Sequence, residues 1–281
     1  MASRASATGA DRVRPATRVL AVVIVPFLVA AFVICYLMPT RTLELFAWGI
    51  RPPLTAMLLA AVYIGGAFFF VRVAMARTWS AVALGFPPVA LFASMLGVTT
   101  VLHWEKFTHG HISFIAWAAL YFTTPFLVVA VAAINAQTAE DVATGPRLPQ
   151  VIRIVLGASG VAELLLAAGL FLAPDWLATM WPWMVTPLTA RTLAAVYALG
   201  LANVLIAMDG RASRVRLQLE VQAVMLVLIA IAAIVRRGDF TAGAGTGYVF
   251  AAIVVAELAV VVDGLVIVRR STVDTVSVNE V

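Results

Sequence analysis

The chain has 281 residues, of which 63% are hydrophobic and only 12% are charged. A soluble domain is typically about half apolar and about a quarter charged, so this composition excludes an ordinary soluble enzyme and predicts an integral membrane protein. The net charge of +5 is not accompanied by a basic patch interleaved with aromatic residues, so we expect no nucleic acid among its partners.

Apolar segments of about 20 residues follow one another along the chain, and each is long enough to cross a hydrocarbon core about 30 Å thick. In chain order they cover residues 18–38, 54–76, 80–102, 112–135, 152–173, 187–208, 217–235 and 246–268. We therefore predict an all-α integral membrane protein with eight transmembrane helices. The connecting loops are too short to fold a soluble catalytic domain.

The first apolar segment follows a basic stretch, as the core of a signal peptide would. It is longer than the usual core of about 7–15 residues, and Met38-Pro39-Thr40-Arg41 follows it in place of a cleavage site. We keep it as a spanning helix. Inside the third segment, Pro87 and Pro88 predict a break or bend, because proline removes a helical hydrogen bond.

Short sequence motifs recur at a nearly constant offset. The two clearest offsets are both 134 positions (187 − 53 and 194 − 60). The recurring pairs are Pro53-Leu54-Thr55-Ala56 with Pro187-Leu188-Thr189-Ala190, Ala60-Ala61-Val62-Tyr63 with Ala194-Ala195-Val196-Tyr197, and Phe107-Thr108 with Phe240-Thr241. A fixed internal period is the sequence signature of a repeat architecture, so we predict two tandem four-helix repeats.

The repeat also predicts the domain boundaries. Residues 1–16 form a disordered cytoplasmic N-terminus, 17–135 the first repeat, 136–150 a cytoplasmic linker, 151–270 the second repeat and 271–281 a cytoplasmic tail. Because each repeat has an even number of helices, both enter the membrane from the same side. We therefore expect a parallel pseudo-two-fold axis along the membrane normal.

Most arginines fall in the loops on the side of the two termini, which places both termini in the cytoplasm. Lys106 is the only lysine among 19 basic residues, a usage typical of GC-rich bacterial genomes. We therefore predict a bacterial cytoplasmic (inner) membrane. The lipid bilayer is the expected partner, and a homo-oligomer or another membrane protein stays open as an alternative.

Positions that match in both halves are explained by the fold, so polar residues found in one half only are the functional candidates. The second half is richer in them. Leu28, Met57 and Thr124 of the first half stand opposite Glu163, Arg191 and Glu257 of the second. The predicted substrate or proton pathway consists of Glu163, Glu257, Arg191, Glu220 and Asn203, with Gln218 and Gln222 close to Glu220.

Depth places the two glutamates of this pathway near the membrane midplane. Glu163 and Glu257 each lie about 16 Å from the surface at which their helices enter, at a rise of 1.5 Å per residue. A charge at that depth costs about 2.5–3.5 kcal/mol on insertion scales, and such residues face a partner or a watery cavity. Arg191 lies nearer the outer surface, and Glu220 and Asn203 lie nearer the inner one.

A purely structural interpretation stays open for each of these residues. Protonated glutamates act as hydrogen-bonding links between helices. Glu220 is close enough to the surface to pair with Arg216, one turn away, and Arg191 can reach outward to the headgroups.

Three histidines and a carboxylate lie together at the outer end of the third and fourth helices: His103, Glu105, His109 and His111. Such residues bind zinc or copper when they converge. A haem at His103 lacks a second histidine at matching depth, and a wet interfacial loop explains the cluster without any ligand. We predict no cofactor, with metal or haem at these histidines as the less favoured alternative.

The segment Trp181-Pro182-Trp183-Met184-Val185-Thr186-Pro187-Leu188-Thr189-Ala190-Arg191 resembles a segment of multi-pass membrane proteins of actinobacteria and other GC-rich bacteria. The resemblance covers only residues 181–191 and the helix that follows them. It implies a membrane protein, and it implies no activity and no functional residue.

The leading functional hypothesis is a small-solute or proton-linked transporter, or a channel-like protein, with a polar site between the repeats. One alternative is a non-catalytic membrane subunit or scaffold. Another is a membrane-embedded lipid-modifying enzyme with a glutamate as general base. An enzyme is the less favoured class, because the glycine-rich segment 243–247 lacks the lysine of a phosphate loop and no nucleophile elbow or zinc-protease motif occurs.

Overall fold

The computed structural model describes all residues except 1–10, 138–144, 242–243 and 279–281. Within these described ranges the protein is helical and has no β-strand. Eight segments are long and apolar enough to cross a membrane, which confirms the number predicted from hydropathy. They cover Pro15–Leu37, Pro53–Met75, Ala83–Leu102, Ile112–Ala136, Gln150–Leu172, Pro187–Asp209, Ala212–Val235 and Gly245–Arg270. The chain is therefore a multi-pass membrane protein.

The first four spans are formed mainly by α2 (Pro15–Phe32), α4 (Pro53–Met75), α5 (Phe86–Leu102) and α6 (Ile112–Ala136). The end of the first span widens into a π-helical turn. Short elements at the ends of these spans are the π turn η1 (Val33–Leu37), the 3₁₀ turns η2 (Pro39–Arg41), η3 (Ala83–Gly85) and η4 (Trp104–Lys106), and α3 (Thr42–Leu45).

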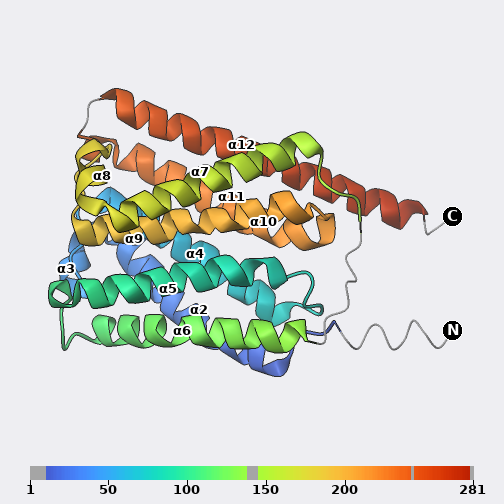
Figure 1. The fold of residues 1–281 in the computed structure, drawn as a ribbon, viewed down its shortest axis with the longest axis horizontal. Helices are drawn as coiled ribbons and strands as arrows, with labels where there is room; N and C mark the ends of the chain where they lie inside the picture. The colour runs from blue at the N-terminus through green and yellow to red at the C-terminus, as the bar shows by residue number, and fades with distance from the viewer. Residues whose placement is uncertain (1–10, 138–144, 242–243, 279–281) are drawn as a thin grey trace.

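The second four spans begin with α7 (Gln150–Leu172), which is followed by the short surface helix α8 (Pro174–Met180). The sixth span is one continuous helical segment that tightens into a 3₁₀ turn in its middle: α9 (Pro187–Tyr197), η5 (Ala198–Gly200) and α10 (Leu201–Asp209). The last two spans are α11 (Ala212–Val235) and α12 (Ala244–Val278), with the 3₁₀ turn η6 (Arg237–Asp239) between them. α2 begins and α12 ends at the same end of the bundle (Figure 1).

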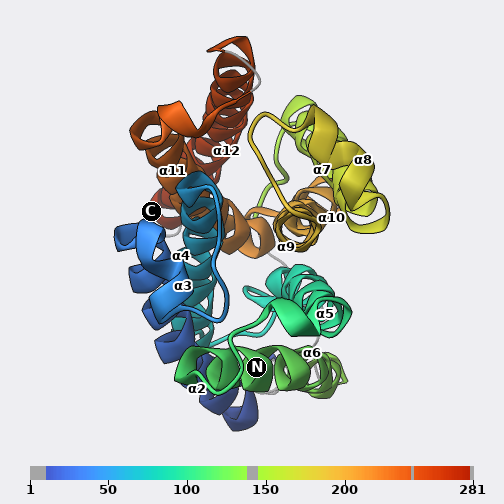
Figure 2. The same cartoon turned by 90° about the vertical axis from the view of Figure 1, so that its left-hand side faces the viewer.

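The helices pack in pairs. In the first half α2 packs on α4 and α5 on α6; in the second half α7 packs on α9 and α10, and α11 on α12. Two further pairs join the halves, α4 with α11 and α5 with α9 (Figure 2). α4 is the most buried span, which explains why its apolar residues surround the whole helix and do not follow one stripe.

The same polar contacts close both halves at the end of the bundle where α2 begins and α12 ends. The guanidinium group of Arg18 donates to the carbonyl oxygens of Ala74 and Ala76 at the end of α4. The guanidinium group of Arg153 donates to the carbonyl oxygens of Ala207 and Met208 at the end of α10. These carbonyl groups have no partner within their own helix, so an arginine from the neighbouring helix satisfies them.

The structure corrects three expectations about the ends of elements. Residues 1–16 were predicted to be disordered. Residues 1–10 lie outside the described ranges, but Asp11 is buried and its carboxylate accepts hydrogen bonds from the amide and hydroxyl of Ser80. Pro87 and Pro88 stand at the first turn of α5 and not inside it, where a missing amide proton costs nothing. α12 continues to Val278, through most of the predicted tail at 271–281.

Candidate functional site

The two glutamates predicted near the midplane face each other. Glu163 comes from the middle of α7 and Glu257 from the middle of α12, and their carboxyl groups lie close enough to interact. Two ionised carboxylates in contact would repel each other.

Asn203 of α10 completes the polar group. Its side-chain Nδ2 donates to Glu257 Oε1 at 2.9 Å and lies 3.4 Å from Ser159 Oγ of α7. Ser159 Oγ in turn donates to the carbonyl oxygen of Leu156. In this arrangement the nitrogen of the Asn203 amide faces Glu257 and Ser159.

The 3₁₀ turn in the sixth span lies directly against Glu163. A β-carbon added at Gly200 would lie 2.5 Å from Glu163 Oε2 and 2.9 Å from the carbonyl oxygen of Gly160. Only a glycine allows α7 and the sixth span to approach this closely. The carboxyl group of Glu163 thus occupies the space at the 3₁₀ turn that a side chain would otherwise fill.

A cavity of about 510 Å³ lies beside the acid pair, between α7, α9, α10, α11 and α12. Its polar lining consists of Ser159, Glu163, Tyr197, Asn203, Gln222 and Glu257. The rest of its wall is apolar. Val155 and Ile253, which also line it, are 42% and 60% exposed, so the mouth of the cavity lies on the lipid-facing side between α7 and α12.

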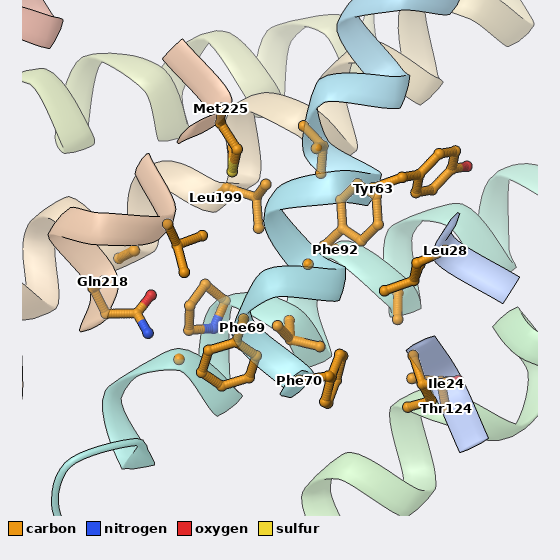
Figure 3. Close-up of a pocket in the computed structure, with 18 of the residues that line it drawn as sticks. Ile24, Leu28, Tyr63, Phe69, Phe70, Phe92, Thr124, Leu199, Gln218 and Met225 are labelled. Carbon is orange, nitrogen blue, oxygen red and sulfur yellow. The ribbon is translucent and has the colours of Figure 1, made fainter. Parts of the chain in front are cut away.

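The expected site lay between the repeats, and Leu58 of α4 in the first half does line this cavity. Glu163, Asn203 and Glu257 all come from spans of the second half, so the polar site lies within that half. The first half has a cavity of its own, of about 90 Å³, which Figure 3 shows. Leu28, Phe69 and Thr124 line it at the sequence positions that correspond to Glu163, Asn203 and Glu257.

Arg191 is not part of the midplane site. Its Nε donates to the carbonyl oxygen of Phe171 at the end of α7, and its Nη1 lies 2.7 Å from His103 Nε2. Burial and the neighbouring Arg191 charge lower the pKa of His103, so the imidazole is neutral and accepts the arginine proton. This contact joins the two halves at the outer end of α5 and α9.

Glu220 also lies apart from the acid pair. Its carboxylate accepts from Arg72 Nη1 at 2.6 Å and from Arg216 Nε at 2.9 Å. The pairing with Arg216 that the sequence suggested is present, and Arg72 adds a link from α4 to α11. The predicted polar path is therefore three separate groups: an outer Arg191–His103 contact, the midplane site and an inner ion-pair network.

The outer histidines have separate environments. The ring of His109 packs against Trp104 and Phe114, and His111 Nδ1 accepts the backbone amide of Ser113 at the start of α6. Within the described ranges, no three His, Cys, Asp or Glu residues converge as a metal site would require, Glu105 included. Metal or haem at these histidines stays an untested prediction, and the arrangement supplies no support for it.

The sequence did not indicate the 3₁₀ turn at residues 198–200 or the role of Tyr197. Tyr197 matches Tyr63 of the first half and was therefore explained by the fold, yet it lines the acidic cavity. Comparison with protein-family models, curated proteins and solved structures gives no match to this chain.

Proposed function

We propose that this protein is a proton-linked transporter of small solutes. The observation that carries the proposal is the neighbouring pair of carboxyl groups on Glu163 and Glu257, in the middle of two spans and at the wall of a cavity. Ionisable residues at that depth are costly, and their common uses are proton relays and ion or substrate pathways. A pair of neighbouring carboxyl groups can bind a proton and release it when a positively charged solute arrives.

The 3₁₀ turn inside the sixth span supports transport over a rigid scaffold. Transporters of several folds place their binding sites near the membrane midplane. A stretch of 3₁₀ helix inside a longer helix often marks a hinge. Here the turn at Ala198–Gly200 lies against Glu163, so a change of protonation there acts directly on the hinge.

We also infer that the two halves are tandem four-helix repeats related by a parallel pseudo-two-fold axis. Equivalent residues make equivalent contacts: Arg18 and Arg153 cap the ends of α4 and α10. The amide of Thr108 donates to the carbonyl of Ala47, as the amide of Thr241 does to Pro182. The pairs α4–α11 and α5–α9 between the halves are also equivalent under this operation.

On this proposal the halves have diverged in role. The first half keeps an apolar cavity, with Leu28 and Thr124 where the second half has the acids. The second half carries the site, and movement at its hinge opens the site to one side or the other. The transporter would act in a bacterial inner membrane, with both termini in the cytoplasm.

The test uses proteoliposomes adsorbed on a solid-supported membrane and subjected to a pH jump. Protons that bind inside the membrane field give a transient current even when no solute is present. We expect this current in the wild-type protein and its loss in Glu163→Gln and in Glu257→Gln. Glu44→Gln is the matched control, because Glu44 forms an exposed ion pair with Arg41 outside the spans and its loss leaves the current unchanged.

A wild-type current equal to that of protein-free liposomes would contradict the proposal. It would show that protons do not reach the acid pair, and it would favour the scaffold alternative, in which the pair links α7 and α12. A current that persists in both glutamine variants would place proton binding elsewhere, with Glu220 as the next candidate.

A further inference from the structure

The cavity beside the acid pair has an unusual balance of hydrogen-bonding groups. Its wall is mainly aliphatic and aromatic, with polar atoms confined to one region around Glu163, Asn203 and Glu257. A site of this kind accepts a molecule with a large apolar body and one polar end. The volume of about 510 Å³ leaves space for such a body.

The unpaired polar atoms at this cavity are acceptors. Asn203 is only 2% exposed, and its Oδ1 has no hydrogen-bond partner. Gln222 Oε1 is also buried without a partner, and both residues line the cavity. A buried acceptor without a donor costs about 1–3 kcal/mol, so a ligand that supplies N–H donors would recover that cost.

The ionisable groups of the site also favour a ligand with N–H donors. The cavity wall carries two carboxyl groups, Glu163 and Glu257, and within the described residues that line the cavity there is no arginine, lysine or histidine to pair with them. The rings of Tyr197 and Phe250 lie in the same wall, and aromatic rings attract cations through their faces. A ligand that complements this cavity is therefore a cation. It must also carry N–H groups, because Asn203 Oδ1 and Gln222 Oε1 are acceptors without a donor.

We propose that the cavity binds lipophilic ammonium ions, that is, protonated primary or secondary amines with an apolar body. The inference rests on the proposed transport function and names its class of substrate. The ammonium group lies among Glu163, Asn203 and Glu257, and the apolar body fills the aliphatic part of the cavity. A proton held by either carboxyl group in the empty site leaves when the ammonium group binds, so one cation is exchanged for another.

The position of the mouth supports this class of ligand. The mouth lies between α7 and α12, at the exposed residues Val155 and Ile253. These residues face the hydrocarbon region of a membrane, where amphiphilic amines partition. Such a ligand reaches the site along the bilayer, without crossing an aqueous loop.

A matched series of three ligands tests the proposal: 1-naphthylmethylamine, its N,N,N-trimethyl derivative and 1-naphthylmethanol. They share the apolar body and differ in charge and in N–H donors. Binding is measured by naphthalene fluorescence with the full chain in lipid nanodiscs, and empty nanodiscs correct for partition into lipid. We expect the amine to bind at least about tenfold more tightly than the alcohol or the trimethyl derivative, since each lacks one required property.

Variants of the site distinguish amine binding in the cavity from non-specific binding elsewhere on the protein. Glu163→Gln and Glu257→Gln should each weaken amine binding by about tenfold or more, while Glu44→Gln should have no effect. Because a glutamine in the spans can impair folding, Ile253→Trp provides a second test. Residue 253 is exposed at the mouth, so tryptophan there blocks entry without disturbing the core, and binding of the amine should be lost.

Equal affinity for all three ligands, or amine binding that survives both Ile253→Trp and Glu163→Gln, would overturn the proposal. Tight binding of the trimethyl derivative alone would also overturn it, because that ligand has no N–H group. The pH-jump current does not depend on the ligand. A wild-type current without amine binding would therefore reject the substrate class and leave proton-linked transport in place.

Discussion

Glu163 and Glu257 differ from their counterparts Leu28 and Thr124 in chemistry and not in location. In both halves the residue on the first helix packs on a glycine of the second: Leu28 on Gly66 and Glu163 on Gly200. The fold thus accepts an apolar side chain at this point. The acids are an addition to the second half, and the packing of the fold does not account for them.

His103 supplies a second residue-level test, because its neutral imidazole accepts the proton of Arg191. Burial and the Arg191 charge lower the pKa of His103 in the folded protein, although Glu105 and Asp175 oppose this shift and Lys106 adds to it. The unfolded chain takes up the proton first, with the ordinary histidine pKa of about 6.5. Stability is therefore present above that pH and is lost as pH falls through it toward the lower folded value.

We expect the unfolding midpoint of the wild-type protein to decrease between pH 8 and pH 5. In His103→Gln the decrease should be smaller, because the glutamine oxygen accepts from Arg191 at every pH. Thermal unfolding in detergent at four pH values measures the pH dependence of the midpoint for the wild type and for His103→Gln, with His109→Gln as the control. Equal slopes for the wild type and His103→Gln would show that this contact does not contribute to the pH dependence.

At the level of elements, the sixth span differs from its counterpart α4. α4 runs unbroken from Pro53 to Met75, whereas the sixth span changes to a 3₁₀ turn at Ala198–Gly200. Both have a glycine at the corresponding position, so glycine alone does not produce the 3₁₀ turn. The 3₁₀ turn occurs where α7 comes closest. A β-carbon added at Gly160 would lie 2.5 Å from the carbonyl oxygen of Gly200, and one added at Gly200 would lie 2.9 Å from that of Gly160.

The two glycines make a matched pair of substitutions. A β-carbon at Gly200 would overlap Glu163 and the backbone of Gly160, whereas one at Gly66 meets only the end of Leu28, at 3.2 Å. We expect Gly200→Ala to destabilise the protein by about 1–3 kcal/mol and to remove the pH-jump current. Gly66→Ala should change stability by less than about 1 kcal/mol, because it also removes the entropic cost of glycine in a helix. Equal effects on unfolding in both variants would contradict this account of the hinge.

For the whole molecule, hydropathy predicted the spans well because the membrane requires about 20 apolar residues wherever a helix crosses it. Depth along a helix was also predictable, and it placed Glu163 and Glu257 at the same level. The rotation of each helix about its own axis was not predictable. Eight largely apolar segments have no row of hydrophobic residues that identifies the face turned toward the other helices. For that reason Arg191 and Glu220 were assigned to a path that they do not join.

The ends of the elements were harder to predict for a different reason. Proline is compatible with the first turn of a helix and breaks its interior, so Pro87 and Pro88 alone do not tell where α5 begins. The order of residues 11–16 depends on Ser80, a contact between positions 69 residues apart in the sequence. Local sequence patterns do not contain such information.

The central claim is that the acidic cavity of the second half is reached from both sides of the membrane. Ser159→Cys in a Cys35→Ala chain tests it most directly, because Ser159 lines the cavity and leaves both glutamates intact. A membrane-impermeant thiol reagent is applied to right-side-out and to inverted vesicles, with Thr40→Cys and Thr78→Cys as exposed controls at the two ends of the bundle. We predict that position 159 is labelled from both sides. Labelling from neither side, in a protein whose two control positions react, would contradict transport and leave Glu163 and Glu257 as a link between helices.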